Sequence, residues 1–120
     1  MSYFFDTYAL VEIIRGNTNY EKYVEETFPT TTLNLSEFYF YLLSNLNEER
    51  ANETLQKFNF SFLEITESTA KEAAKFRRAN YKRKLSYIDC IGYILAKNVN
   101  FKFLTGEDFF ENMNNVEFVK

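Results

Sequence analysis

Short stretches of β-type composition alternate along the chain with longer stretches whose apolar residues recur at helical spacing. The β-type stretches are residues 2–5, 30–33, 60–65, 100–104 and 116–119. Apolar periodicity predicts helices over 7–15, 18–27, 35–46, 48–58, 67–83, 87–97 and 107–113, with Pro29 stopping the second of them. Strands that alternate with helices form a parallel sheet covered on both faces. We therefore predict an α/β fold of three layers, with about five short strands in a mostly parallel central sheet.

Composition favours a folded chain and narrows its chemistry. The 120 residues contain 14 Phe and 9 Tyr and show no linker or repeat, which predicts a single domain over residues 1–120. The chain has no histidine and one cysteine, which excludes Ser–His and Cys–His nucleophile pairs, His-ligated metals and structural zinc. Its three glycines form neither a dinucleotide-binding turn nor a P-loop. Carboxylates remain, either as acids and bases or as ligands of a hard cation such as Mg²⁺ or Mn²⁺.

Signals for export or membrane insertion are missing from the sequence. No stretch approaches the ~20 apolar residues of a membrane span. The opening residues "MSYFFDTYAL" have neither a basic start nor a small-residue cleavage site. These features predict a cytoplasmic protein without a membrane segment.

Five acidic residues follow the predicted strands or begin the helices after them. They are Asp6, Glu37, Asp89, Glu107 and Asp108. The carboxyl ends of parallel strands meet at one edge of a sheet, where ligand sites form. We therefore expect these acids, although far apart in sequence, to converge in space.

Helix capping is a competing explanation for most of these acids. Three pairs have the spacing of a capping box, in which an acid at the third helical position bonds back to the N-cap amide. The pairs are Asn34 and Glu37, Ser86 and Asp89, and Thr105 and Asp108. Asp6 has no such partner, although it could itself cap the helix that begins near Thr7. Convergence of the whole set, rather than any single acid, would indicate function.

Two neighbourhoods favour a functional role. The predicted helix 35–46 is apolar nearly all round, so Glu37 is expected to be partly desolvated and to need a partner. Asp89 lies at the edge of an apolar stripe beside Gly92 and Ala96. These small residues either leave room for a metal ion or phosphate, or allow close helix packing.

Positive charge is concentrated in residues 71–84, the basic segment, which contains seven of the 14 Lys and Arg residues. On a helix, Lys71, Lys75, Arg78 and Lys82 form one stripe, followed by Arg83 and Lys84. This stripe is either a solvated surface or a contact for the phosphates of a nucleic acid. Arg77 falls on another face, where it would contact RNA or form an ion pair with one of the acids.

The sequence resembles the PIN domain, and most closely the short VapC toxins of toxin–antitoxin pairs. The resemblance rests on "YFFDTYALVEIIRG", "LSEFYFYLL", "LSYIDCIGYILAKNVNFKFLTGEDFF" and "VEFVK", and it runs nearly end to end. It is most specific around Asp6 and over residues 85–110. The resemblance implies that Asp6, Glu37, Asp89 and an acid of "TGED" form a pocket for Mg²⁺ or Mn²⁺ that cleaves single-stranded RNA.

The fourth acid departs from the family pattern, which is usually Thr-x-Asp-x-x-Phe. Aligning Thr105 and Phe110 with that pattern puts Glu107 in the acidic position and Asp108 one residue later. We assign Glu107 to the metal site and Asp108 to the cap, with Asp108 as the alternative fourth acid.

The resulting hypothesis is a metal-dependent endoribonuclease holding one or two Mg²⁺ or Mn²⁺ ions. Thr7 and Thr105 would orient the ligands, and the resemblance implies an RNA substrate, a small antitoxin partner and a homodimer. A carboxylate phosphatase with a nucleophile at "FDTYA" is an alternative, although Tyr8 replaces its usual second Asp. A further alternative is an RNA- or protein-binding module with a degenerate pocket.

Overall fold

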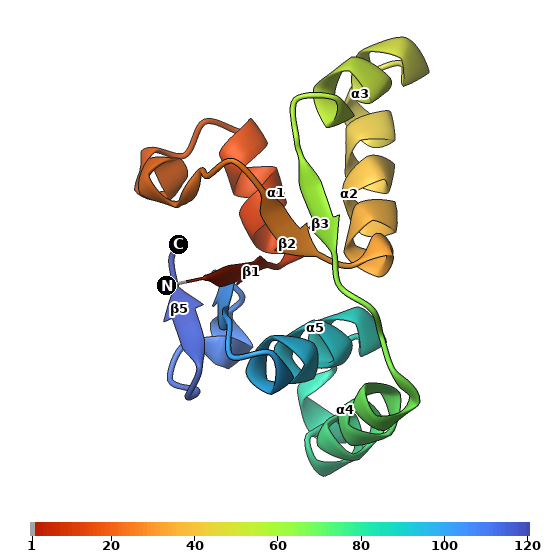
Figure 1. Ribbon diagram of the computed structural model, residues 1–120, viewed down its shortest axis with the longest axis vertical. Coiled ribbons are helices and arrows are strands. Elements are labelled where there is room, and N and C mark those ends of the chain that lie inside the picture. Colours follow the sequence, from red (N-terminus) through yellow and green to blue (C-terminus); the bar gives the residue numbers. More distant parts are fainter. Residues whose placement is uncertain (1) are drawn as a thin grey trace.

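The structure is a computed structural model that describes residues 2–120 (Figure 1). Its strands are β1 (Tyr3–Phe5), β2 (Phe28–Thr30), β3 (Phe60–Phe62), β4 (Lys102–Thr105) and β5 (Val116–Phe118). Its α-helices are α1 (Thr7–Ile14), α2 (Thr32–Asn45), α3 (Glu48–Leu55), α4 (Glu67–Ala79) and α5 (Tyr87–Asn98). Short 3₁₀ helices are η1 (Thr18–Tyr23), η2 (Tyr81–Arg83) and η3 (Asp108–Phe110). None of the helices in this part of the chain is long and apolar enough to cross a membrane.

The strands pair in parallel, as predicted, but their backbone hydrogen bonds form two small sheets. One sheet has the order β1-β4-β5 with β4 paired on both sides, and the other joins β2 to β3. A side chain links the two sheets, because the Thr30 hydroxyl donates a hydrogen bond of 2.8 Å to the carbonyl oxygen of Phe5. The predicted parallel sheet of about five strands is confirmed, although its backbone hydrogen bonding is interrupted between β1 and β2.

Alternation along β1 and β4 divides the interior into two cores. Phe5 and the paired Leu104 belong to one buried cluster, together with residues of α1, α2 and α3. Phe4 and the paired Phe103 belong to the other, together with residues of α4 and α5. Figure 1 shows the two helix groups on opposite sides of the strands. Successive strand residues point to opposite faces, so this pattern produces the predicted three layers.

The segment between α1 and α2 differs from the prediction. A 3₁₀ helix, η1, replaces the predicted helix 18–27, and Pro29 lies inside β2 instead of stopping a helix. Proline is tolerated there because the strand bonds its partner through the Phe28 N–H and the Thr30 carbonyl, so no ladder bond needs an N–H at position 29. The helix α2 therefore begins at Thr32 rather than at residue 35.

Two predicted helices near the basic segment and the C-terminal strands are shorter than expected. The predicted helix 67–83 ends at Ala79 and is followed by the separate turn η2, so Lys82 does not continue the stripe of α4. The predicted helix 107–113 is the single turn η3.

Candidate active site

The site begins where two neighbouring parallel strands end. Asp6 follows β1, and Thr105 is the last residue of β4. The Thr105 hydroxyl donates a 2.7 Å hydrogen bond to Asp6 Oδ2, and the Asp6 N–H donates to the Leu104 carbonyl at 3.2 Å. The chain continues from β1 to β2 on one side, while β4 lies on the other. Such a reversal of strand order opens a crevice at the carboxyl ends of the strands.

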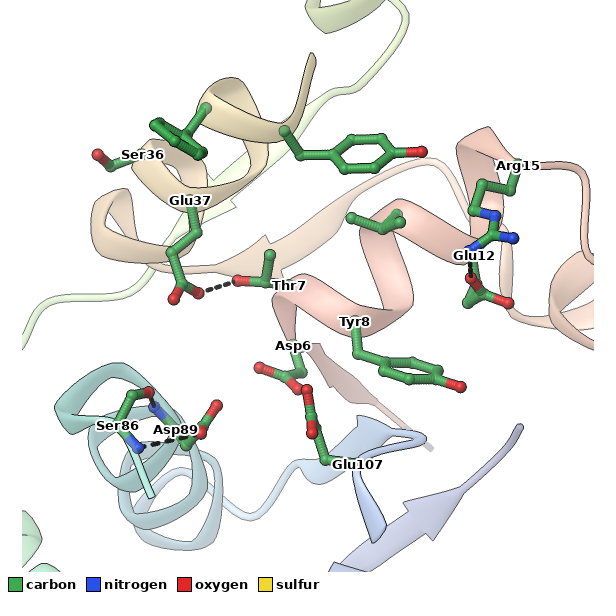
Figure 2. Close-up of a pocket in the computed structure, with 13 residues that line it drawn as sticks. Asp6, Thr7, Tyr8, Glu12, Arg15, Ser36, Glu37, Ser86, Asp89 and Glu107 are labelled. Atoms are coloured by element: carbon green, nitrogen blue, oxygen red, sulfur yellow. Dashed lines mark hydrogen bonds and ion pairs between the residues drawn. The ribbon is translucent and has the colours of Figure 1, made fainter. Parts of the chain in front are cut away.

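Four of the five predicted acids line one cavity of about 740 Å³ at this position. They are Asp6, Glu37, Asp89 and Glu107, and they come from four different segments of the chain (Figure 2). We call this space the acidic cavity. Asp108 lies outside it, exposed, and pairs with Lys120 at 2.5 Å. The convergence expected from the sequence is therefore observed for four acids, while their chemical roles stay predictions.

Asp6 is the least solvated of these acids. Its side chain is 1% exposed, and within the described residues its Oδ1 atom has no hydrogen-bond partner. Burial raises the pKa of Asp6 from 3.8 to about 8, and repulsion by Asp89 and Glu107 adds to the effect while the Thr105 bond opposes it. A buried carboxylate oxygen without a donor needs either a proton or a cation.

A chain of hydrogen bonds orients Glu37. Thr31 donates to Asn34 Oδ1 at 2.6 Å, Asn34 Nδ2 donates to the Thr7 oxygen at 3.0 Å, and Thr7 donates to Glu37 Oε1 at 2.6 Å. Each hydroxyl has a single proton, so the direction of the whole chain is fixed. Burial and Asp89 raise the pKa of Glu37, and the Thr7 bond opposes the rise. This network holds the carboxylate at the wall of the acidic cavity.

Asn34 was missed as a contributor to the site, because the sequence suggested that it capped a helix. Thr31 is the N-cap, and its hydroxyl oxygen accepts from the Asn34 N–H at 3.2 Å. The predicted capping box between Asn34 and Glu37 is therefore wrong, and Glu37 lies in the second turn of α2. An amide three residues before an acid within an apolar stretch was the available signal, since such a pair faces the same side of a helix.

Asp89 has the predicted capping geometry and also lines the acidic cavity. Its N–H donates to Ser86 Oγ at 3.0 Å, and the Ser86 N–H donates to Asp89 Oδ2 at 3.3 Å. Only one carboxylate oxygen takes part in this cap, so capping leaves the other available to a ligand. The negative charge of Asp89 raises the pKa of Asp6, Glu37 and Glu107.

Gly92 serves packing rather than ligand binding. A Cβ atom at this position would lie 3.0 Å from the Phe4 ring and 3.1 Å from the Phe103 ring. Of the two explanations offered by the sequence, close packing of α5 on the sheet is the one observed.

The "TGED" turn places Glu107, not Asp108, at the cavity. The Thr105 oxygen accepts from the Glu107 N–H at 3.1 Å, so the predicted capping box between Thr105 and Asp108 is wrong. Glu107 is the N-cap of η3 and makes no side-chain cap bond. Burial and then Asp89 raise the pKa of Glu107, while Lys120 opposes the rise. The turn requires Gly106, because a Cβ there would collide with the Tyr8 ring and the Val119 carbonyl.

Comparison with known families identifies this arrangement of strands and acids. The PIN domain model matches residues 3–116. The chain belongs to the PIN domain family. No curated protein sequence matches it.

Solved structures with this PIN fold include several toxin–antitoxin proteins. A toxin–antitoxin complex from Klebsiella pneumoniae is 18% identical, with a TM-score of 0.72 over 98% of this chain and 96% of the other. VapBC2 from Rickettsia felis, bound to a DNA fragment from its promoter, is 16% identical, with a TM-score of 0.75 over 99% and 98%. VapC20 from Mycobacterium tuberculosis, a toxin that cleaves the sarcin–ricin loop, is 13% identical, with a TM-score of 0.70 over 97% and 99%. These similarities establish a shared fold.

The acidic cavity of this PIN domain suits a hard cation by chemistry. Nucleases of the family use divalent metal ions as a class. The donors here are carboxylate oxygens, and one of them, on Asp6, is buried without a hydrogen-bond donor. As the side chains stand, no three ligating residues within 2–120 are grouped so that they could hold one ion. Binding therefore requires rotation of the acid side chains or bridging water molecules.

The basic segment lies outside the lining of the cavity. Lys71, Lys75 and Arg78 are exposed on α4, and Lys82, Arg83 and Lys84 are exposed in and after η2. Lys71 pairs with the exposed Glu67 at 2.9 Å, a contact that contributes little to stability. The contact of these cations with RNA stays a prediction.

Arg77 has a packing role in this structure. Its Nε donates to the Leu85 carbonyl at 3.0 Å, and its guanidinium carbon lies 4.1 Å from the centre of the Tyr87 ring. Among the ion pairs of residues 2–120, none includes Arg77. The ion-pair role considered from the sequence is therefore not observed.

Proposed function

We propose that this PIN domain protein is a metal-dependent endoribonuclease that cleaves single-stranded RNA as the toxin of a toxin–antitoxin pair. One observation carries the proposal: the buried Asp6 carboxylate has an oxygen without a donor, in a cavity that Glu37, Asp89 and Glu107 also line. Family membership supports a nuclease. The cost of leaving such a group unpaired is difficult to explain by folding alone.

The four acids would hold Mg²⁺ or Mn²⁺. When bound, one or two such ions would activate a water molecule and offset negative charge on the scissile phosphate. Thr105 bonds Asp6 only at Oδ2, which keeps Oδ1 directed to a cation. Thr7 fixes one oxygen of Glu37 and leaves its second oxygen to the cavity. The two threonines thus hold Asp6 and Glu37 in place, and rotation of the other acids or bridging water molecules would complete the site.

The basic segment would bind the RNA backbone next to this cavity. It ends at Lys84, two residues before Ser86, which lines the cavity. Contacts of Lys and Arg with phosphates are independent of sequence and weaken with salt. RNA would therefore be held by its backbone while the acids act on one phosphodiester.

A small antitoxin and a second copy of the chain are the proposed protein partners. The three structural neighbours come from toxin–antitoxin systems, which supports an antitoxin. The second copy of the chain rests on the resemblance to VapC toxins alone.

The proposal is tested by incubating purified protein with mixed single-stranded RNA, with Mn²⁺ or with EDTA. Cleavage that needs the metal and is lost in Asp6→Asn is the expected result. Asp108→Asn is the matched control, because this acid is exposed and outside the cavity. A folded wild-type protein that binds RNA and never cleaves it would favour the binding-module alternative. Phosphorylated protein after turnover of a small phosphoester would favour the phosphatase.

A further inference from the structure

The acidic cavity is larger than a metal site requires. Its volume is about 740 Å³. A divalent ion with six water molecules of ~30 Å³ each would occupy ~200 Å³. More than half of the space is therefore available to another part of a bound molecule. This remaining space lies along α1 and α2.

Aromatic side chains line this second part of the cavity. Phe40 and Tyr41 follow Glu37 by three and four residues on α2, so they share its helix face at a spacing of ~5–6 Å between Cβ atoms. Tyr8 and Val11 line the opposite wall from α1. Phe40 is 74% exposed, although sequence periodicity suggested that α2 was buried nearly all round. Its ring is thus an accessible flat surface beside the acids.

A positive charge stands at the far end of the same space. Arg15 lines the cavity and follows the last residue of α1, nine residues after Asp6. At 1.5 Å per helical residue the two are ~14 Å apart along the helix. Figure 2 shows Arg15 at the end of α1 opposite to Asp6. Glu12 also lines the cavity here and contacts Arg15 at 3.5 Å. This ion pair is long and the arginine side chain is 64% exposed, so a phosphate would compete with Glu12 for the guanidinium.

We infer that Phe40 stacks against a nucleobase next to the scissile phosphate, and that Arg15 contacts the following phosphate. This inference rests on the proposed nuclease function. Along the cavity the acids come first, then the aromatic rings, then Arg15. In a nucleic acid strand a phosphate, a base and the next phosphate follow in the same order, so each part of the cavity faces a matching group. Bases stack on aromatic side chains with little sequence preference, and they do so when unpaired. The subsite therefore selects an unpaired strand over a duplex.

Kinetics with paired variants test the stacking role. Phe40→Ala is expected to raise KM for a short single-stranded RNA about ten-fold or more, with kcat nearly unchanged. Phe40→Leu keeps apolar volume and loses the π-face, so it should also raise KM. Phe62→Ala is the matched control, because Phe62 is a 45% exposed ring on β3 that does not line the cavity. Mn²⁺ affinity, measured by calorimetry without RNA, should be the same in all four proteins.

An abasic nucleotide placed on either side of the cleavage site locates the stacked base. On the side where the base stacks, the abasic substrate should raise KM for the wild type and leave the KM of Phe40→Ala unchanged. The missing base and the missing ring remove the same stacking contact, so the second change has no further effect. Arg15→Gln should reduce the salt slope of RNA binding by about one phosphate contact.

Three outcomes would overturn the inference while the wild type still cleaves RNA. The first is a KM for Phe40→Ala equal to that of Phe62→Ala. The second is an abasic substrate that raises KM equally for the wild type and Phe40→Ala. The third is a change of oligomeric state in Phe40→Ala without a change in KM. The last would assign Phe40 to a contact between copies. Failure of the wild type to cleave any RNA would instead refute the nuclease proposal, and the subsite with it.

Discussion

Replacing Asp6 with asparagine should stabilise the metal-free protein, and increasingly so as the pH rises. The pKa of Asp6 is raised from 3.8 to about 8 in the folded state. Below pH 3.8 the carboxyl is protonated in both states, so the free energy of unfolding carries no penalty. Between these values the unfolded chain releases the proton and the folded chain retains it, so stability falls as pH rises. Above pH 8 the full penalty is present.

The difference between the two pKa values of Asp6 sets the size of this stability penalty. At ~1.4 kcal/mol per pH unit, the difference between these two pKa values corresponds to a full loss of ~6 kcal/mol, most of which falls between pH 4 and pH 8. Asp6 is 1% exposed, so solvent screening does not reduce this figure appreciably. Asparagine has nearly the same shape, keeps an oxygen for the Thr105 hydroxyl and does not ionise. The difference in unfolding free energy between variant and wild type should therefore be small at pH 4 and reach several kcal/mol at pH 8.

The assay is urea unfolding of both proteins in EDTA from pH 4 to pH 9. The other titrating groups are common to both proteins and largely cancel in the difference. Asp108→Asn is the control, because it removes a carboxylate that lies outside the cavity. Mn²⁺ at a hundred times Kd should then stabilise the wild type by ~2.7 kcal/mol and Asp6→Asn much less. Parallel pH curves for wild type and Asp6→Asn would refute the reasoning.

Five substitutions, one of them the control Asp108→Asn, separate structural from chemical roles. Asp89→Asn keeps an oxygen that can accept the cap bond, so denaturant unfolding should show a loss of ~1 kcal/mol or less. RNA cleavage should fall about a hundred-fold. Retained cleavage would mean that Asp89 acts only as a helix cap. Glu107→Gln should lower the Mn²⁺ affinity measured by calorimetry, and Asp108→Asn should not. The reverse result would make Asp108, rather than Glu107, the fourth acid of the metal site. Gly106→Ala should lose ~2 kcal/mol of stability through its collision with the Tyr8 ring; an unchanged midpoint would contradict this. Asn34→Ala should lose ~2–3 kcal/mol because two side-chain hydrogen bonds disappear, one buried and one partly buried, and an equally stable variant would show that they contribute little.

Local patterns made part of this site predictable. Asp6 follows a short apolar strand, and the Ser86–Asp89 cap needs only residues three apart, so both could be read from neighbouring positions. The alternation of strands and helices predicted the layers and the parallel pairing. Strand ends then predicted the convergence of the acids, because in this architecture those ends are adjacent.

The sequence-based predictions that were wrong or incomplete concern features that depend on contacts between residues far apart in the chain. Pro29 indicated a helix end, yet β3 bonds the strand around it and makes no demand on its missing N–H. Thr105 has the local spacing of a cap for Asp108, but its oxygen accepts from the Glu107 N–H while its hydroxyl donates to Asp6, which follows another strand. Periodicity along α2 could not show that Phe40 remains exposed, since exposure depends on which elements cover that face.

The bond between Thr105 and Asp6 joins residues 99 positions apart. Closing so long a loop costs conformational entropy, which only the docking of β4 beside β1 repays. The cavity is therefore a late product of folding: while the ribosome is still making the segment before β4, the chain has Asp6 and Glu37 but neither Thr105 nor Glu107. A nascent chain of the proposed toxin would be inactive until β4 had been synthesised and had docked. Because β4 is the central strand of its sheet and contributes to both cores, a finished molecule would lose the cavity only by unfolding.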